Sequence, residues 1–119
     1  MNEKNIIEIT SEGLLYLNEN GETQFINFED CYQRYLDRWN DPDNVRRFRE
    51  GNPTRSDEEL DASLERIRAK KEVGWRDFSV PYIRFYTEPP IRFDFSDITE
   101  FHSVEGLVRK AGWRTFDGA

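Results

Sequence analysis

Residues 14–26 read LLYLNENGETQFI and combine two apolar segments with the strongest turn signal of the chain. Asn20 and Gly21 accept the positive φ angles that a two-residue hairpin turn requires. With these two residues at the turn centre, Tyr16 lies directly opposite Phe25. This pairing predicts a β-hairpin that carries apolar side chains on both of its faces.

A third strand is predicted before this hairpin. The segment from Asn5 to Thr10 is rich in isoleucine, whose branched side chain favours a strand. Ser11-Glu12-Gly13 interrupts the apolar pattern before the hairpin begins. The N-terminal part of the chain is therefore expected to form a three-strand meander.

Two helices are predicted to follow the meander. Asn27 can cap the first helix, in which apolar residues recur at steps of three and four up to Trp39. Asp41 followed by Pro42 marks the start of a short second helix, because proline is favoured in the first helical turn.

A third helix is predicted from Ser56. The sequence Ser56-Asp57-Glu58-Glu59 is a capping box, and Leu60 opens a narrow apolar face. We expect this helix to run to about Glu72, with Gly74 as its C-cap.

From Phe78 onward the apolar period changes to two, which predicts a second hairpin. Ile83 and Phe85 point to one face, the chain turns at residues 88–90, and Phe93 returns on the same face. The opposite face carries Tyr82, Arg84, Tyr86 and Arg92.

The C-terminal segment completes the predicted fold. Ser103 can cap a short helix that ends near Ala111, and residues 113–116 are compatible with a final strand. The fold class is therefore α+β: a mainly antiparallel sheet from an N-terminal three-strand meander and a C-terminal hairpin, with about three central helices and one short C-terminal helix.

The chain has 119 residues, the usual size of one domain, and residues 1–119 are predicted to form a single α+β domain. Aromatic residues make up 14%, enough to build a core without disulfides. Cys31 is a single cysteine, and neither a signal peptide nor an apolar run of membrane-spanning length is found. We expect a cytoplasmic protein that does not associate with membranes.

The net charge of −7 is concentrated near the N-terminus, because acidic and basic residues balance over residues 45–119. This charge disfavours nucleic acid and anionic lipid as partners. A partner of the acidic end, where Glu19 and Glu22 lie at the predicted hairpin tip, is expected to be basic. Solubility alone explains the same charge.

Candidate catalytic residues are few. His102 is the only histidine, and the apolar stripe around Cys31 predicts a buried, inert thiol. Asp41, Asp43 and Asn44 have the spacing that begins a calcium loop, but the glycine and glutamate that complete such a loop are missing. No catalytic residue, metal site or cofactor is predicted.

One face of the second hairpin carries a pattern suited to single-stranded nucleic acid. Tyr82 and Tyr86 could stack on bases, with Arg84 and Arg92 beside them. Asp94 shares this face, and ordinary cross-strand pairs on a solvated sheet explain the pattern better.

Protein association is the leading hypothesis for function. A hairpin that is apolar on both faces needs a later element of the chain, a second copy or another protein to cover its second face. We expect a non-enzymatic protein that acts as a homodimer, or as an inhibitor-like or immunity-like binder of a basic partner. The candidate interface residues are Leu14, Tyr16, Glu19, Glu22, Phe25, Tyr82, Arg84, Tyr86 and Arg92.

The alternative hypothesis is a small ligand-binding protein or enzyme with an aromatic pocket between the sheet and the long helix. Aromatic side chains can line cavities, although they more often fill cores. The candidate pocket residues are Tyr32, Tyr35, Trp39, Phe85, Phe93 and His102.

Overall fold

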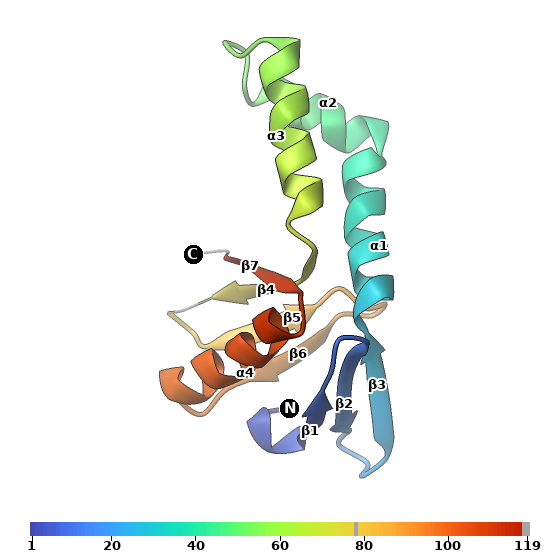
Figure 1. Ribbon diagram of the computed structural model, residues 1–119, viewed down its shortest axis with the longest axis vertical. Coiled ribbons are helices and arrows are strands. Elements are labelled where there is room, and N and C mark those ends of the chain that lie inside the picture. Colours follow the sequence, from blue (N-terminus) through green and yellow to red (C-terminus); the bar gives the residue numbers. More distant parts are fainter. Residues whose placement is uncertain (78, 118–119) are drawn as a thin grey trace.

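A computed structural model describes residues 1–77 and 79–117, and within them it confirms the α+β class and the N-terminal meander (Figure 1). Phe78, where the second hairpin was predicted to begin, lies outside the described residues. No described helix has the length and apolar character needed to span a membrane. In chain order the elements are η1 (Glu3–Asn5), β1 (Ile6–Ile9), β2 (Gly13–Leu17), β3 (Thr23–Asn27), α1 (Phe28–Asn40), α2 (Pro42–Glu50), α3 (Asp57–Ala69), β4 (Glu72–Asp77), β5 (Tyr82–Phe85), β6 (Ile91–Asp94), α4 (Ile98–Lys110) and β7 (Arg114–Asp117).

The strands form two sheets. The N-terminal sheet has the order β1-β2-β3, and the C-terminal sheet has the order β6-β5-β4-β7. The β4–β7 pair is parallel and the other pairs are antiparallel. The molecule is elongated, with extents of 49, 26 and 23 Å, and Figure 1 shows α2 and α3 at the end opposite the N-terminal sheet.

The first hairpin forms, but the predicted two-residue turn is wrong. Leu15 rather than Tyr16 pairs with Phe25, so the register differs by one residue. The Asn18 side chain accepts hydrogen bonds of 2.9 Å from the amides of Asn20 and Glu22, which stabilises a wider turn. Gly21 supplies the positive φ of 80° that such a turn needs at its last position.

The end of α3 was also predicted wrongly. The helix stops at Ala69, and Lys71 takes the left-handed conformation with φ 54°. Gly74 lies inside β4, where an added Cβ would come within 2.8 Å of the Arg84 carbonyl oxygen. The glycine therefore permits close packing of β4 on β5 and does not cap a helix.

The C-terminal region contains the predicted strands and a longer helix than predicted. α4 begins at Ile98 because the Asp97 side chain accepts a hydrogen bond of 2.9 Å from the Glu100 amide, so Ser103 is not its cap. Residues 114–117 form β7, which confirms the predicted final strand.

One cluster of buried side chains joins the two sheets, α1 and α4. The Tyr16 ring meets the Phe93 ring edge-on at 5.4 Å between centroids, which links the N-terminal sheet to β6. Phe28 at the start of α1 stacks on Phe85 at 5.9 Å. Phe101 of α4 has no exposed surface and covers the same core. This core fixes α1 against both sheets.

Candidate functional site

The N-terminal sheet leaves apolar side chains exposed on the side away from the core. On this side the exposed fractions are 50% for Phe25 and 39% for Leu17. The Phe25 ring lies over Gly13, since a Cβ at Gly13 would come within 2.6 Å of the ring. The prediction that both faces of the hairpin are apolar is therefore confirmed. We call this surface the outer face of the N-terminal sheet.

The predicted interface residues of the first hairpin fall into two groups. Leu14 and Tyr16 lie in the core with exposed fractions of 0% and 5%, so their side chains are not available to a partner. Glu19, Glu22 and Phe25 are exposed. Only the second group lies on a surface that a partner could reach.

β3 differs from the other three edge strands formed by residues 1–77 and 79–117. β1 carries Glu8 and a bulge beside it. β6 carries Arg92 and Asp94, and the Asp94 amide already donates to the Met1 carbonyl at 2.8 Å. β7 begins with Arg114. β3 has no charge, proline or bulge, the features that protect natural edge strands from pairing.

The outer face of the C-terminal sheet holds three of the other predicted interface residues, Tyr82, Arg84 and Arg92, whereas Tyr86 is partly buried and stacks on Tyr35 of α1. The Arg92 guanidinium lies 3.8 Å from the centre of the Tyr82 ring and pairs with Asp94 at 2.8 Å. Trp75 and Phe116 extend this face, with ring centroids 5.1 Å apart. Sequence reasoning missed Trp75 because it placed a helix end where β4 lies.

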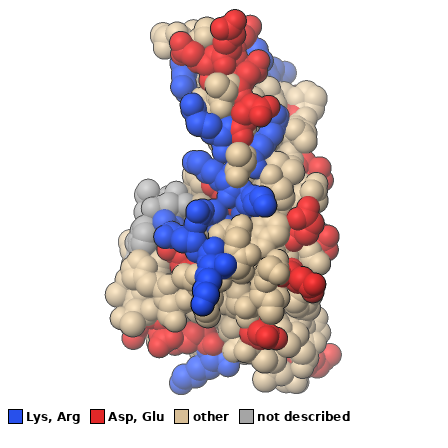
Figure 2. Space-filling model, in the orientation of Figure 1, with Lys and Arg blue, Asp and Glu red and all other residues tan. Residues whose placement is uncertain are grey.

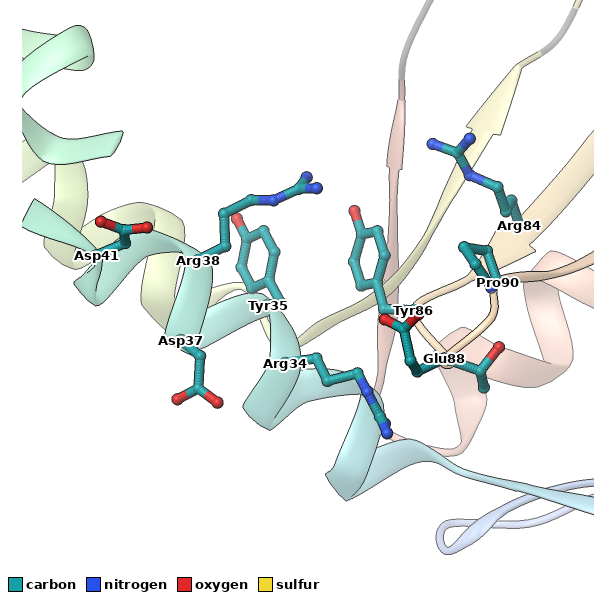
Figure 3. Close-up of a pocket in the computed structure, with 10 residues that line it drawn as sticks. Arg34, Tyr35, Asp37, Arg38, Asp41, Arg84, Tyr86, Glu88 and Pro90 are labelled. Atoms are coloured by element: carbon teal, nitrogen blue, oxygen red, sulfur yellow. The ribbon is translucent and has the colours of Figure 1, made fainter. Parts of the chain in front are cut away.

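A cavity of about 560 Å³ lies between α1 and the β5–β6 turn (Figure 3). At its base the Tyr35 and Tyr86 rings stack with an angle of 4° between their planes and 5.7 Å between centroids. Burial raises the pKa of both hydroxyls, so both are protonated at neutral pH. The lining residues are Arg34, Tyr35, Asp37, Arg38, Asp41, Arg84, Tyr86, Thr87, Glu88 and Pro90.

Among the candidate pocket residues, Tyr35 is the one that lines this cavity. Phe85 and Phe93 have no exposed surface and pack against each other at 5.9 Å in the core. The remaining three candidates lie in three different places. Tyr32 contacts Trp113, Trp39 contacts Phe48, and His102 is exposed on α4.

Glu72 is a buried carboxyl group that sequence reasoning missed. Its exposed fraction is 3%, and its Oε2 atom has no hydrogen-bond partner. Burial raises the pKa of Glu72, and a hydrogen bond from Tyr35 opposes that rise. Its position at the start of β4, beside the two tyrosines, depends on long-range packing rather than on local sequence.

The two candidate reactive groups lie in different environments, with Cys31 in the core and His102 exposed on α4. Cys31 is buried, and burial raises the pKa of its thiol to about 11. In residues 1–77 and 79–117, histidine, cysteine, aspartate and glutamate form no cluster of three or more that could hold a metal ion. Glu105, the other buried carboxylate, pairs with Arg76 and Arg109.

The surface charge is segregated on the face that Figure 2 shows. Basic side chains form a band over the C-terminal ends of α3 and α4, and acidic side chains gather above and below it. The exposed basic residues of these segments and the adjoining β-strand are Arg66, Lys70, Lys71, Arg109, Lys110 and Arg114.

Comparisons of the chain with protein-family models, with curated proteins and with solved structures give no match.

Proposed function

We propose that the chain acts by self-association, with the β3 strands of two copies paired antiparallel about a two-fold axis at Phe25. The observation that carries this proposal is the β3 edge, which is uncharged and unbulged and lies beside exposed apolar side chains. The pairing would extend the three-stranded sheet to six strands. Because both copies use the same strand, the interface is closed and self-complementary.

Phe25 would form the apolar centre of this interface. In an antiparallel pair centred on Phe25 the two rings lie on the same face, with Cβ atoms roughly 4.5–5.5 Å apart. Each ring is 50% exposed, which leaves about 100 Å² for a side chain of this size. Covering both rings contributes at most about 5 kcal/mol before the entropy of association is subtracted. We therefore expect weak association, with a dissociation constant on the order of 0.1–1 mM.

The charge of the chain gives a second line of reasoning. Two copies with a net charge of −7 repel each other, and salt screens this repulsion. Added salt is therefore expected to strengthen the dimer. Binding of a basic partner by the acidic N-terminal end would weaken with salt. The sign of the salt dependence separates self-association from the inhibitor-like alternative.

Light scattering after size exclusion tests the proposal. The mass of the unmodified chain should rise with concentration from 14.3 kDa towards twice that value. Phe25→Lys should hold the mass at one chain, because a charge on an edge strand opposes pairing. Ile7→Lys is the matched control, since Ile7 is 52% exposed and lies on the opposite edge strand.

Two results would contradict the proposal. The first is a mass that stays at one chain up to roughly 1 mM. The second is an equal loss of association in both variants, which would assign the effect to exposed apolar area in general rather than to β3.

A further inference from the structure

The cavity between α1 and the β5–β6 turn is independent of the β3 edge, because none of its lining residues belongs to the N-terminal sheet. It has the volume of a small-ligand site. Its walls come from α1 on one side and from β5 and the turn after it on the other (Figure 3). The wall positions are fixed by the stacked Tyr35 and Tyr86 rings, since Tyr35 is only 7% exposed.

Two guanidinium groups face the same part of this cavity. In Figure 3 the Arg38 guanidinium lies on one side of the Tyr86 hydroxyl, and the Arg84 guanidinium lies on the other side and further from it. Within the described part of the chain, neither side chain forms an ion pair or a hydrogen bond, whereas Arg92 on the neighbouring strand pairs with Asp94 at 2.8 Å. No carboxylate of the described residues therefore neutralises the charge of Arg38 or Arg84 by direct contact.

Tyr86 adds a hydrogen-bond donor between them. Its hydroxyl has no hydrogen-bond partner among the described residues, in contrast to the Tyr32 hydroxyl, which donates to the Arg68 carbonyl at 2.6 Å. Because the Tyr86 hydroxyl stays protonated at neutral pH, it can donate to an acceptor in the cavity.

The acidic residues of the cavity lie apart from this donor set. In Figure 3 Asp37 points away from the tyrosine rings, and Asp41 lies further along the chain. Glu88 lies on the side of Arg34. Among the described residues, Glu72 is the one carboxyl group that acts on Tyr86, and burial disfavours its charged form. The two guanidinium groups therefore give the cavity a positive end around Tyr86, which suits the negative group of a ligand.

We infer that the cavity between α1 and β5 binds an oxyanion, the carboxylate or phosphate group of a small ligand, between the Arg38 and Arg84 guanidinium groups and the Tyr86 hydroxyl. Guanidinium groups match the planar geometry of carboxylate and the oxygen face of phosphate. The rest of the ligand would occupy the volume towards Arg34 and Glu88.

A titration of the folded protein with small anions tests this inference. Binding is monitored through the Nε–H resonances of the arginine side chains in proton–nitrogen-15 spectra. The probes are inorganic phosphate, acetate and, as reference, chloride at matched ionic strength. Phosphate or acetate should shift the Arg38 and Arg84 resonances along a saturable one-site curve. A stronger effect of phosphate indicates a phosphate ligand, and a stronger effect of acetate indicates a carboxylate ligand.

Variants locate the site. Binding to Arg84→Gln is followed by the Arg38 resonance, and binding to Arg38→Gln by the Arg84 resonance. Each substitution should weaken binding roughly tenfold, because it removes a charged hydrogen-bond donor. Arg92→Gln is the matched control on the adjacent strand, where Arg92 is the cross-strand neighbour of Arg84, and it should leave binding within about twofold.

Two outcomes would overturn the inference. One is that phosphate and acetate shift the two resonances no more than chloride does. The other is that Arg92→Gln weakens binding as much as Arg84→Gln. Repeating the titration on Phe25→Lys keeps the result separate from self-association, because that substitution lies on the N-terminal sheet.

Discussion

Glu72→Gln is expected to make the folded protein more stable at neutral pH. Glu72 is 3% exposed, its Oε2 atom has no hydrogen-bond partner, and no ion pair to it is found in the described residues. Burial disfavours its charged form and raises its pKa, while Tyr35 and Lys70 only partly oppose that rise. Glutamine keeps the size of the side chain and an acceptor for Tyr35, but it carries no charge.

The sign of the pH dependence follows from the raised pKa of Glu72. A carboxyl group whose pKa is higher in the folded state binds its proton more tightly there, so folding stability is lost as the pH rises through the folded pKa. An incompletely satisfied buried group costs about 1–3 kcal/mol, and the Tyr35 hydrogen bond offsets part of this cost. We expect Glu72→Gln to be about 1 kcal/mol more stable at neutral pH and to match the unmodified chain in acid, where the carboxyl group is protonated.

Urea unfolding monitored by tryptophan fluorescence, in buffers on both sides of the Glu72 transition, measures this difference. Glu65→Gln is the control, because Glu65 is exposed on α3 and its charge is removed in the same way. A Glu72→Gln protein that is less stable than the unmodified chain at neutral pH would contradict a buried, destabilising charge at Glu72. A stability difference that does not change with pH would contradict it equally.

Two further predictions concern the backbone and the hairpin tip. Gly74→Ala should lower the free energy of unfolding by about 2 kcal/mol or more, because its Cβ would lie 2.8 Å from the Arg84 carbonyl oxygen. Gly106→Ala should raise the free energy of unfolding by up to about 1 kcal/mol, because a Cβ at this position on α4 meets no other atom. Urea unfolding measures both differences. Replacing Glu19 and Glu22 with glutamine should strengthen self-association by reducing repulsion, and weaker association in sedimentation equilibrium would contradict this.

Local sequence predicted the starts of α1, α2 and α3 but not the start of α4. The side chains of Asn27, Asp41 and Ser56 accept hydrogen bonds from backbone amides two or three residues ahead, as their sequence positions indicated. Such caps depend only on neighbouring residues, so a single sequence is sufficient to locate them. The turn after β2 failed for a local reason as well, because the Asn18 side chain stabilises a wider loop than the Asn20-Gly21 pair suggested.

β4 could not be predicted from local pattern. Its residues from Glu72 to Asp77 contain a glycine and several charges, and the strand is stabilised by pairing with β5 and with the distant β7. Missing β4 also hid two features of the candidate sites. These are the buried carboxyl group of Glu72 and the Trp75 ring on the outer sheet face.

The candidate sites were predicted only in part. The two apolar faces of the first hairpin were evident from the sequence, and Phe25 is exposed as an interface residue must be. Tyr35 and Tyr86 were both named as candidates, but for different surfaces, because only the packing of α1 on the C-terminal sheet brings them together. Phe85 and Phe93 lie on the inner face of the second hairpin, and their polar neighbours lie on its other face. Both rings are fully buried in the core and do not line a pocket.

The pairing of β3 with a second copy is tested most directly by nuclear Overhauser contacts in an equal mixture of isotope-labelled and unlabelled chain. In the proposed antiparallel pair, Gln24 of one copy lies opposite Ile26 of the other, with Phe25 opposite itself. We therefore predict intermolecular contacts between Gln24 and Ile26. A sample that light scattering shows to be dimeric, but whose intermolecular contacts involve Trp75 or Phe116 and not β3, would contradict the proposed mode of association.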